Sequence, residues 1–211
     1  MKKKILISTG GTGGHVIPAT ILYQHLESNC EVFLCSDVRG IKFLDLNKYN
    51  VKIIDVPKLS KNIIKIPINI LIFISSIIKS ILFLKKKKIE LLISTGGYMS
   101  LPLCLAAKCL FIKIILFEPN MVLGRSNKLF LRFSDKILCY SENLKNFPNK
   151  FKIKIKIIEP LIRKDFYKNP VNKSNSKTFN LLILGGSQGA SIFDKHIKNS
   201  IIELSKNYQL K

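Results

Sequence analysis

Short apolar runs alternate with longer, mixed segments from residue 4 to residue 159. Each run is bounded by glycine, proline or charged residues, and the segments between them are long enough for helices or loops. This alternation predicts an α/β fold with a parallel, doubly wound sheet. The predicted strands cover residues 4–8, 31–36, 51–56, 113–117, 136–140 and 154–159, and a further apolar strand opens the segment 91–102. The predicted helices cover 17–27 and 101–110.

Three apolar runs lead into glycine-rich turns, and the first turn is followed by His15. Its glycines allow positive φ and close backbone approach, and Pro18 suits the first turn of the next helix. The carboxyl ends of parallel strands meet at one edge, so the three turns are expected to line one crevice. Free N–H groups there favour phosphate or diphosphate. The glycines of the first turn are Gly10, Gly11, Gly13 and Gly14.

Two other interpretations of the first turn remain open. Gly11 and Gly13 follow a strand, and Asp37 closes the next one, as in a dinucleotide-binding fingerprint, but Val16 stands where the third glycine would be. The other interpretation is a strand-to-helix turn without a ligand. No Gly-Lys-Ser/Thr triplet follows, which excludes a P-loop.

The formal net charge of +22 raises the question of a nucleic-acid partner. Only four of the 35 basic residues are arginine, although bidentate phosphate recognition favours arginine. The sequence has no RNP or helix-turn-helix pattern, so we do not expect nucleic acid to be the partner. Abundant lysine, isoleucine and asparagine suggest AT-rich coding, with a share of the charge facing a membrane.

The five cysteines form no CxxC pair and no cluster with histidine. This distribution predicts small buried hydrophobic residues rather than disulfides or a metal site. The apolar run that follows Met1 and three lysines is too short for a signal peptide, so we expect the protein to stay in the cytoplasm.

Residues 58–88 allow three interpretations, because an apolar run at 68–84 is almost long enough to span a bilayer and ends at four lysines. The first is a buried crossover helix. The second is a transmembrane helix, against which Asn69, Lys79 and several serines argue. The third, which we favour, is a helix with one face on the domain and another in the membrane surface.

Five motifs together resemble the MurG family of peptidoglycan glycosyltransferases, in the order and spacing of that family. They are Gly10–His15, Gly96–Tyr98, Glu118–Asn120, Pro160–Arg163 and Gly185–Ala190. The resemblance covers essentially all 211 residues. It implies a GT-B fold, in which two Rossmann-like domains face each other across a cleft and the second holds most of the nucleotide sugar. The chain departs from the family at Phe117, Pro119 and Glu159, where the family usually has His, Gln and Asn.

The resemblance implies transfer of GlcNAc from UDP-GlcNAc to the C4 hydroxyl of undecaprenyl-linked MurNAc-pentapeptide (lipid I), with inversion and without a metal or other cofactor. His15 is then the general base, and Glu118 an acid or base partner. A capping turn at Glu118–Asn120 and a surface ion pair at Arg163 remain alternatives. The implied substrate-binding residues are Thr12, Gly13, Gly14, Gly96, Gly97, Tyr98, Asn120, Arg163, Ser187 and Gln188.

An acceptor that cannot leave the bilayer favours the interfacial helix and a peripheral position on an anionic membrane surface, at the cytoplasmic face of the bacterial inner membrane. The expected membrane-facing residues are Ile70, Phe73, Ile74, Ile77, Lys79 and Phe83.

Three segments are expected: an acceptor and membrane-binding domain at residues 1–163, a polar linker at 164–177, and the start of a truncated donor-binding domain at 178–211. One strand and one helix cannot bury a core of their own. Two further hypotheses therefore stand beside the enzyme: a non-catalytic acceptor-binding half whose donor half is a separate chain, and an inactive remnant.

Overall fold

The computed structural model describes residues 2–54, 56, 66–168 and 197–207. The chain divides into two units, Met1–Lys168 and Asn169–Lys211. In the second unit the described part includes helix α7 (Lys198–Asn207). The third glycine turn, with Ser187 and Gln188, lies outside the described residues, as does most of the expected linker.

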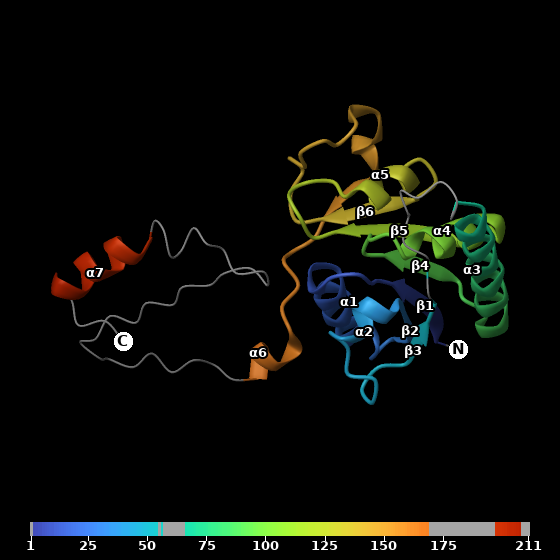
Figure 1. Cartoon of the computed structure of the whole chain (residues 1–211), viewed down its shortest axis with the longest axis horizontal. Helices are drawn as coiled ribbons and strands as arrows, with labels where there is room; N and C mark the ends of the chain where they lie inside the picture. Colours follow the sequence, from blue (N-terminus) through green and yellow to red (C-terminus); the bar gives the residue numbers. More distant parts are fainter. Residues whose placement is uncertain (1, 55, 57–65, 169–196, 208–211) are drawn as a thin grey trace. The chain divides into compact units, whose positions relative to one another are not determined.

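The first unit contains a parallel sheet with the strand order β3-β2-β1-β4-β5-β6-β7 (Figure 1). All six neighbouring pairs are parallel. The order runs outward in both directions from the β1–β4 pair, so the connections reverse there and the sheet is doubly wound, as predicted. The strands are β1 (Lys3–Ser8), β2 (Cys30–Ser36), β3 (Val51–Ile53), β4 (Leu91–Ser94), β5 (Lys113–Glu118), β6 (Lys136–Cys139) and β7 (Ile155–Ile157).

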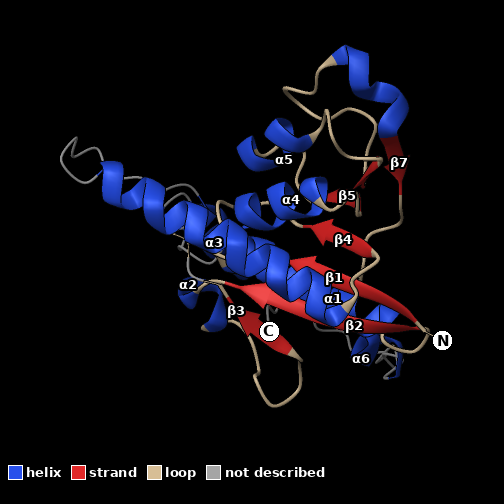
Figure 2. Ribbon diagram, turned by 90° about the vertical axis from the view of Figure 1, so that its right-hand side faces the viewer, coloured by secondary structure: helices blue, strands red, loops and turns tan. Residues whose placement is uncertain are grey.

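The central strands read as continuous apolar runs because both faces of the sheet are covered. Leu6 and Phe33 belong to one hydrophobic cluster, whereas Ile7 and Leu34 belong to the other. The first cluster includes residues of α3 (Ile66–Lys87), α4 (Ser100–Cys109) and α5 (Arg125–Phe130). The second includes residues of α1 (Gly13–Leu26). Figure 2 shows α3, α4 and α5 following one another along the molecule.

Helix α1 begins earlier than predicted, at Gly13, inside the glycine-rich turn. Pro18 is therefore the sixth residue of α1 and not part of its first turn, so that expectation is wrong. A proline here has no N–H to donate to the carbonyl four residues earlier, at Gly14. Of the four glycines in the turn, only Gly11 has positive φ, at 81°.

Helix α3 has the two-faced form of the third interpretation. Its buried residues are Ser76, Ser80 and Leu84, spaced four apart, and it packs against α4. The serine hydroxyls donate to carbonyls one turn earlier, with Ser80 Oγ 2.7 Å from the Ser76 oxygen. Short side chains on the inner face leave the large aliphatic ones outside. The exposed apolar residues are Ile66, Ile68, Ile70, Leu71, Ile72, Ile74, Ile78 and Leu82.

Two of the expected membrane-facing residues point the other way. Phe73 and Phe83 pack against the core, and the rings of Phe83 and Phe33 meet edge to face with centroids 6.5 Å apart. Ile77 is half-buried, whereas Ile70, Ile74 and Lys79 are exposed as expected. Within the described residues, α3 is the helix that is long and apolar enough to cross a bilayer by length and composition.

The remaining elements are short. Helix α2 (Val38–Ile41) follows β2, and a 3-10 helix at Asn149–Lys154 precedes β7. Residues Lys164–Lys168 form helix α6, which contacts α1, so the expected linker begins with a helix and not with extended chain.

Candidate functional site

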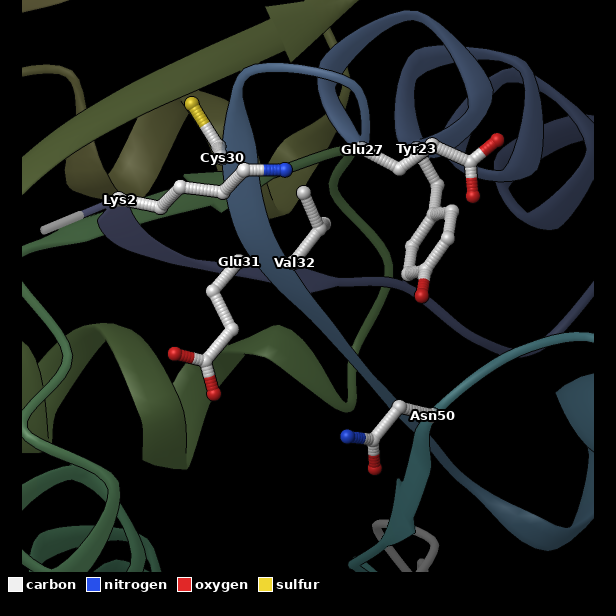
Figure 3. Close-up of a pocket in the computed structure, with 7 residues that line it drawn as sticks. All are labelled: Lys2, Tyr23, Glu27, Cys30, Glu31, Val32 and Asn50. Atoms are coloured by element: carbon white, nitrogen blue, oxygen red, sulfur yellow. The ribbon is translucent and has the colours of Figure 1, made fainter.

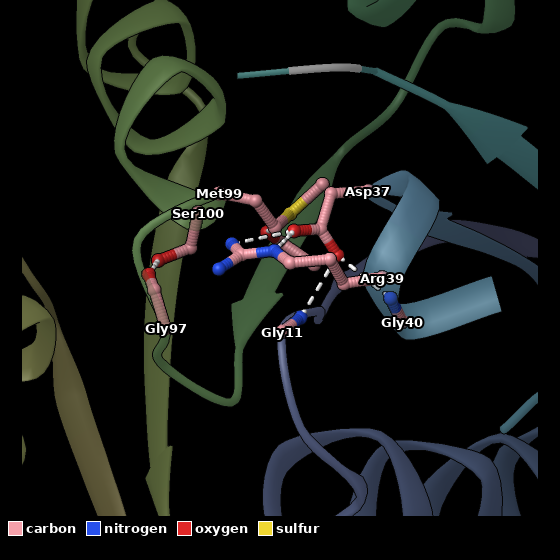
Figure 4. A network of polar contacts seen from close by, with 8 residues as sticks. Gly11, Asp37, Arg39, Gly40, Gly97, Met99 and Ser100 are labelled. Atoms are coloured by element: carbon pink, nitrogen blue, oxygen red, sulfur yellow. Dashed lines mark hydrogen bonds and ion pairs between the residues drawn. The ribbon is translucent and has the colours of Figure 1, made fainter. Parts of the chain in front are cut away.

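The first glycine turn is braced by Asp37 from the neighbouring strand (Figure 4). Asp37 Oδ1 accepts from the backbone N–H groups of Gly11, at 2.8 Å, and Gly40, at 2.9 Å. Its other oxygen accepts from Arg39, at 2.8 Å from Nε and 2.7 Å from Nη2. A carboxylate with both oxygens engaged in this way fixes the turn against α2.

Burial alone would raise the pKa of Asp37, but hydrogen bonds from Gly11, Gly40 and Arg39 outweigh it and hold the pKa below its usual value. The residue is 2% exposed. In a dinucleotide fold an acid at the end of the second strand binds a ribose. Here both carboxylate oxygens of Asp37 are hydrogen-bonded within the protein, so Asp37 is not available to bind a ribose. This argues against the dinucleotide-binding interpretation.

Two N–H groups at the start of α1 remain available. The N-cap residue Thr12 makes no side-chain capping bond. No acceptor is recorded for the N–H groups of Gly13 and Gly14 among the residues that the structure describes. Such donors, together with the helix dipole, favour an anion.

The second glycine turn lies directly against the first because β1 and β4 are neighbours. Gly96 and Gly97 have positive φ values of 86° and 83°. A methyl group added to Gly97 would lie 3.2 Å from the carbonyl oxygen of Gly10, and one added to Gly96 would lie 3.3 Å from Asn127 Nδ2. Glycine is therefore required here by both conformation and space.

His15 joins the two turns. Its Nδ1 atom lies 2.8 Å from the carbonyl oxygen of Thr95, the residue that follows β4. A carbonyl oxygen can only accept, so Nδ1 carries the proton in a neutral ring and Nε2 has the free lone pair. This is the protonation pattern of a general base.

Glu118 holds the loop that follows β5. It is 1% exposed and accepts from the Gly124 N–H at 2.8 Å, from Asn127 Nδ2 at 3.0 Å and from Asn120 Nδ2 at 3.0 Å. Both oxygens are thus occupied, which favours a positioning role over the acid or base role expected for Glu118. Asn120 is held by this carboxylate and is not among the residues of the cleft described next.

A cleft of about 560 Å³ opens beside His15. A hydrogen bond of 2.8 Å between the hydroxyls of Ser100 and Ser126 links the starts of α4 and α5 beside it. The cleft brings together His15, Gly97 and Tyr98, three of the expected site residues. Its full lining is His15, Gly97, Tyr98, Leu101, Gly124, Arg125, Ser126 and Leu129.

Arg163 is separated from these turns. The carbonyl oxygen of its neighbour Ile162 accepts from His25 Nε2 at 2.9 Å, in the last turn of α1. Ten residues of helix separate His15 from His25, which corresponds to about 15 Å. The backbone before Arg163 thus lies beside the C-terminal end of α1, away from the glycine turns, and the expected substrate-binding role of Arg163 stays a prediction.

A second cavity, of about 450 Å³, lies where β1 and β2 begin, at the other edge of the sheet (Figure 3). It is lined by Lys2 together with Glu27 and Glu31, among others. Lys2 Nζ already donates to the carbonyl oxygen of Ser28 at 2.9 Å. Neither of the two glycine turns that the structure describes reaches this edge, so the cleft beside His15 is the better site.

The cysteines of the described residues are free thiols. Cys35, Cys104 and Cys139 are buried free thiols, and burial raises the pKa of Cys104 and Cys139 to about 12. Cys109 is exposed, contrary to the expectation of a buried residue. Across residues 2–54, 56, 66–168 and 197–207, no group of three or more His, Cys, Asp or Glu side chains could hold a metal ion.

Comparison with known proteins decides the family. Residues 5–139 match the glycosyltransferase family 28 N-terminal domain, which is most of the first unit. The chain belongs to glycosyltransferase family 28.

Two relatives show which branch of glycosyltransferase family 28 this chain resembles. A protein of Pelagibacter ubique is 63% identical over 212 residues, covering 100% of this chain and 59% of the relative. A protein of Rickettsia canadensis is 36% identical over 218 residues, covering 99% of this chain and 59% of the relative. Both are named UDP-N-acetylglucosamine–N-acetylmuramyl-(pentapeptide) pyrophosphoryl-undecaprenol N-acetylglucosamine transferase. This family 28 chain thus spans about 59% of their length.

A solved structure agrees with the family 28 fold. The crystal structure of Acinetobacter baumannii MurG matches 95% of this chain and 57% of its own, with a TM-score of 0.71 and 22% identity. The parallel, doubly wound α/β sheet predicted from the alternation of strands and helices is therefore confirmed, and it matches the fold of a MurG structure.

Several residues of this family 28 site were not singled out from the sequence. Thr95 contributes only a carbonyl oxygen, which no side-chain pattern can reveal. Leu101, Arg125 and Leu129 look like ordinary helix residues and acquire a role only where α4 and α5 meet. Asn127 lies in a segment, 126–132, that resembles the next helix of the MurG family, but its bond to Glu118 depends on the fold.

Proposed function

We propose that this chain provides the acceptor side of a transferase that moves GlcNAc from UDP-GlcNAc to lipid I and so forms lipid II. The observation that carries this proposal is His15, whose Nε2 is left unprotonated by the Nδ1 bond to Thr95 at the mouth of the cleft. The names of the two relatives support the choice of substrates.

In the proposed reaction, His15 Nε2 takes the proton of the acceptor C4 hydroxyl. The hydroxyl oxygen then bonds to the anomeric carbon of GlcNAc, the bond from that carbon to UDP breaks, and UDP leaves with the electron pair. The N–H groups of Gly13, Gly14 and Gly97 hold the acceptor diphosphate. Inversion follows from a single displacement.

The other proposed site residues have supporting roles. Thr12, Gly96 and Tyr98 shape the two turns, and Glu118 keeps Asn120 and the start of α5 in place. Ser187 and Gln188 lie outside the described residues, and their expected substrate-binding role stays a prediction.

The exposed face of α3 is proposed to bind the anionic cytoplasmic surface of the inner membrane as a peripheral contact. Its outer apolar residues would enter the headgroup region, and the lysines at its C-terminal end would pair with lipid phosphates. Leu71 and Leu82, 68% and 62% exposed, are the strongest candidates.

A second candidate function is a binding half without activity of its own. It is favoured by the match of residues 5–139 to an N-terminal domain, the domain that would bind the acceptor. In this case residues 1–163 bind lipid I and a separate polypeptide supplies the donor half, with 164–177 as the linker between domains.

The test is GlcNAc transfer from labelled UDP-GlcNAc to a lipid I analogue, measured for this chain and for His15→Ala. His25→Ala is the matched control, because His25 lies on the same helix but at its far end. Transfer that His15→Ala abolishes and His25→Ala keeps supports the enzyme. Lipid I binding without transfer, with activity regained when the C-terminal part of the Pelagibacter ubique relative is added, supports the binding half. Neither binding nor transfer contradicts both.

A further inference from the structure

The cleft beside His15 is lined by both polar and apolar residues. Its polar lining includes His15 and Arg125, the latter at the start of α5. Its apolar lining includes Leu101 and Leu129. A ligand that fills this cleft must therefore combine a charged group with an apolar one.

Arg125 is the free charge of the cleft. Its side chain is exposed, and the ion pairs recorded for the described residues, Lys4–Glu31 and Arg39–Asp37, do not include it. The nearby carboxylate of Glu118 is already occupied by Gly124 and Asn127. The guanidinium can thus take two oxygens of an incoming phosphate.

Leu129 is an exposed apolar residue of the cleft, and a bound phosphate would not cover it. It is 61% exposed on α5, although it lines a cleft. Leu101, on α4, lines the same cleft and is half-buried. An inorganic phosphate or a sugar would leave this surface in contact with water, whereas an apolar chain would cover it.

The surroundings give such a chain a route. Helices α3, α4 and α5 contribute to one hydrophobic cluster, on the same face of the sheet, with α4 between the other two (Figure 2). A chain leaving the cleft beside Leu101 can cross α4 next to half-buried Leu105 and reach the apolar face of α3 without crossing the sheet.

We propose that the cleft binds the first isoprene units of a polyprenyl diphosphate, with Leu101 and Leu129 against the isoprene units and Arg125 paired with the diphosphate. This inference rests on the proposed function. It adds contacts with the isoprene units, which the glycine turns do not touch, and a second contact with the diphosphate that the turns hold. It makes Leu129 and Arg125 specificity-determining residues for the lipid part of the acceptor.

The experiment is isothermal titration of this chain with farnesyl diphosphate, inorganic pyrophosphate and farnesol, without membranes. Leu129→Asn is compared with Leu46→Asn, whose leucine is also exposed, at 51%, but lies outside the cleft. Arg125→Gln is compared with Arg132→Gln, an exposed arginine that does not line the cleft.

We expect farnesyl diphosphate to bind more tightly than either pyrophosphate or farnesol. Leu129→Asn should weaken farnesyl diphosphate about tenfold and leave pyrophosphate unchanged, because it removes only apolar contact. Arg125→Gln should weaken both diphosphates about tenfold. Both control variants should bind like the unaltered chain.

Equal affinity for farnesyl diphosphate and pyrophosphate would overturn the inference, as would unchanged binding in both cleft variants. A transfer assay separates this failure from that of the proposed function. If transfer to the lipid I analogue depends on His15 but not on Leu129 or Arg125, only the assignment of the cleft is wrong. If the unaltered chain binds no lipid I, the proposed function itself fails.

Discussion

The Nδ1 atom of His15 lies 2.8 Å from the carbonyl oxygen of Thr95, so a side chain from one glycine turn is oriented by the backbone of the next. The two residues are 80 positions apart in the chain. They meet because β1 and β4 are neighbours in the sheet, with Ser8 paired to Ser94. The bond favours one tautomer of the neutral imidazole, the one with its proton on Nδ1.

The first prediction concerns this protonation state. At a pH where His15 is neutral, its proton should be on Nδ1, because Thr95 offers only an acceptor. Long-range ¹H–¹⁵N NMR spectra of the labelled chain distinguish the two forms, and His15→Ala assigns the signal. A proton on Nε2 would contradict the arrangement that supports the general base.

The second prediction concerns Asp37 and stability. Asp37→Ala should lower the free energy of unfolding by about 3 kcal/mol, because it leaves two backbone N–H groups and Arg39 without their buried acceptor. Urea unfolding followed by circular dichroism measures the loss. Asp45→Ala is a suitable control, since Asp45 is exposed and its only recorded side-chain bond is to the N–H of Asn47. Equal losses of unfolding free energy in the two variants would contradict the stabilising role of Asp37.

The same carboxylate predicts a pH dependence. The pKa of Asp37 is lowered in the folded chain, so the unfolded chain takes up this proton more readily as the pH falls. Its contribution is complete above the unfolded pKa of about 3.9 and is lost as the pH falls through the folded pKa. The free energy of unfolding of Asp37→Asn should therefore fall less steeply below about pH 4 than that of the unaltered chain. Parallel slopes would show that Asp37 does not contribute.

The third prediction compares two glycines of one turn. A methyl group on Gly10 would lie 2.6 Å from Met99 Cγ and 2.7 Å from Asp37 Oδ1, whereas one on Gly14 would lie 3.7 Å from its nearest neighbour. Gly10→Ala should cost about 1–3 kcal/mol through overpacking. Gly14→Ala should be neutral or stabilising by up to about 1 kcal/mol, because it lies in a helix with ordinary φ. Thermal unfolding of both variants checks the difference.

The fourth prediction concerns the cysteines. Cys109 should react rapidly with Ellman's reagent, whereas Cys35, Cys104 and Cys139 should react only on unfolding, since burial raises the pKa of each thiol. Cys109→Ser should remove the rapid phase, and all five thiols should react in urea. Rapid reaction of the buried thiols at neutral pH would mean that the first unit opens easily.

The fifth prediction tests the membrane face of α3. Leu71→Asp combined with Leu82→Asp should reduce sedimentation with phosphatidylglycerol vesicles at least about tenfold, because charge replaces the most outward apolar side chains. Ile153→Asp is the control, since Ile153 is 94% exposed but lies outside α3. Added salt should weaken binding of the unaltered chain by screening its lysines. Equal binding by both variants would exclude α3 as the contact.

The sequence by itself determined the alternation of strands and helices, and hence the parallel sheet. Each buried strand had to be a short apolar run, and each strand-to-helix turn needed glycine where φ is positive or space is short, as at Gly11, Gly96 and Gly97. These requirements are local, so they are visible along the chain. The motif Gly10–His15 is also local, so the sequence alone identified His15 as a site residue.

Only the tertiary structure decided which residues share the site. The strand order places Thr95 beside His15. The chain that leads to Arg163 lies instead at the far end of α1, although Thr95 and Arg163 both come after strands of the same sheet. The packing of α3 on α4 turned Phe73 and Phe83 inward and left Leu71 and Leu82 outside, because the serine stripe fixed the inner face. Hydrophobicity alone cannot distinguish the two faces of a helix that is apolar all round.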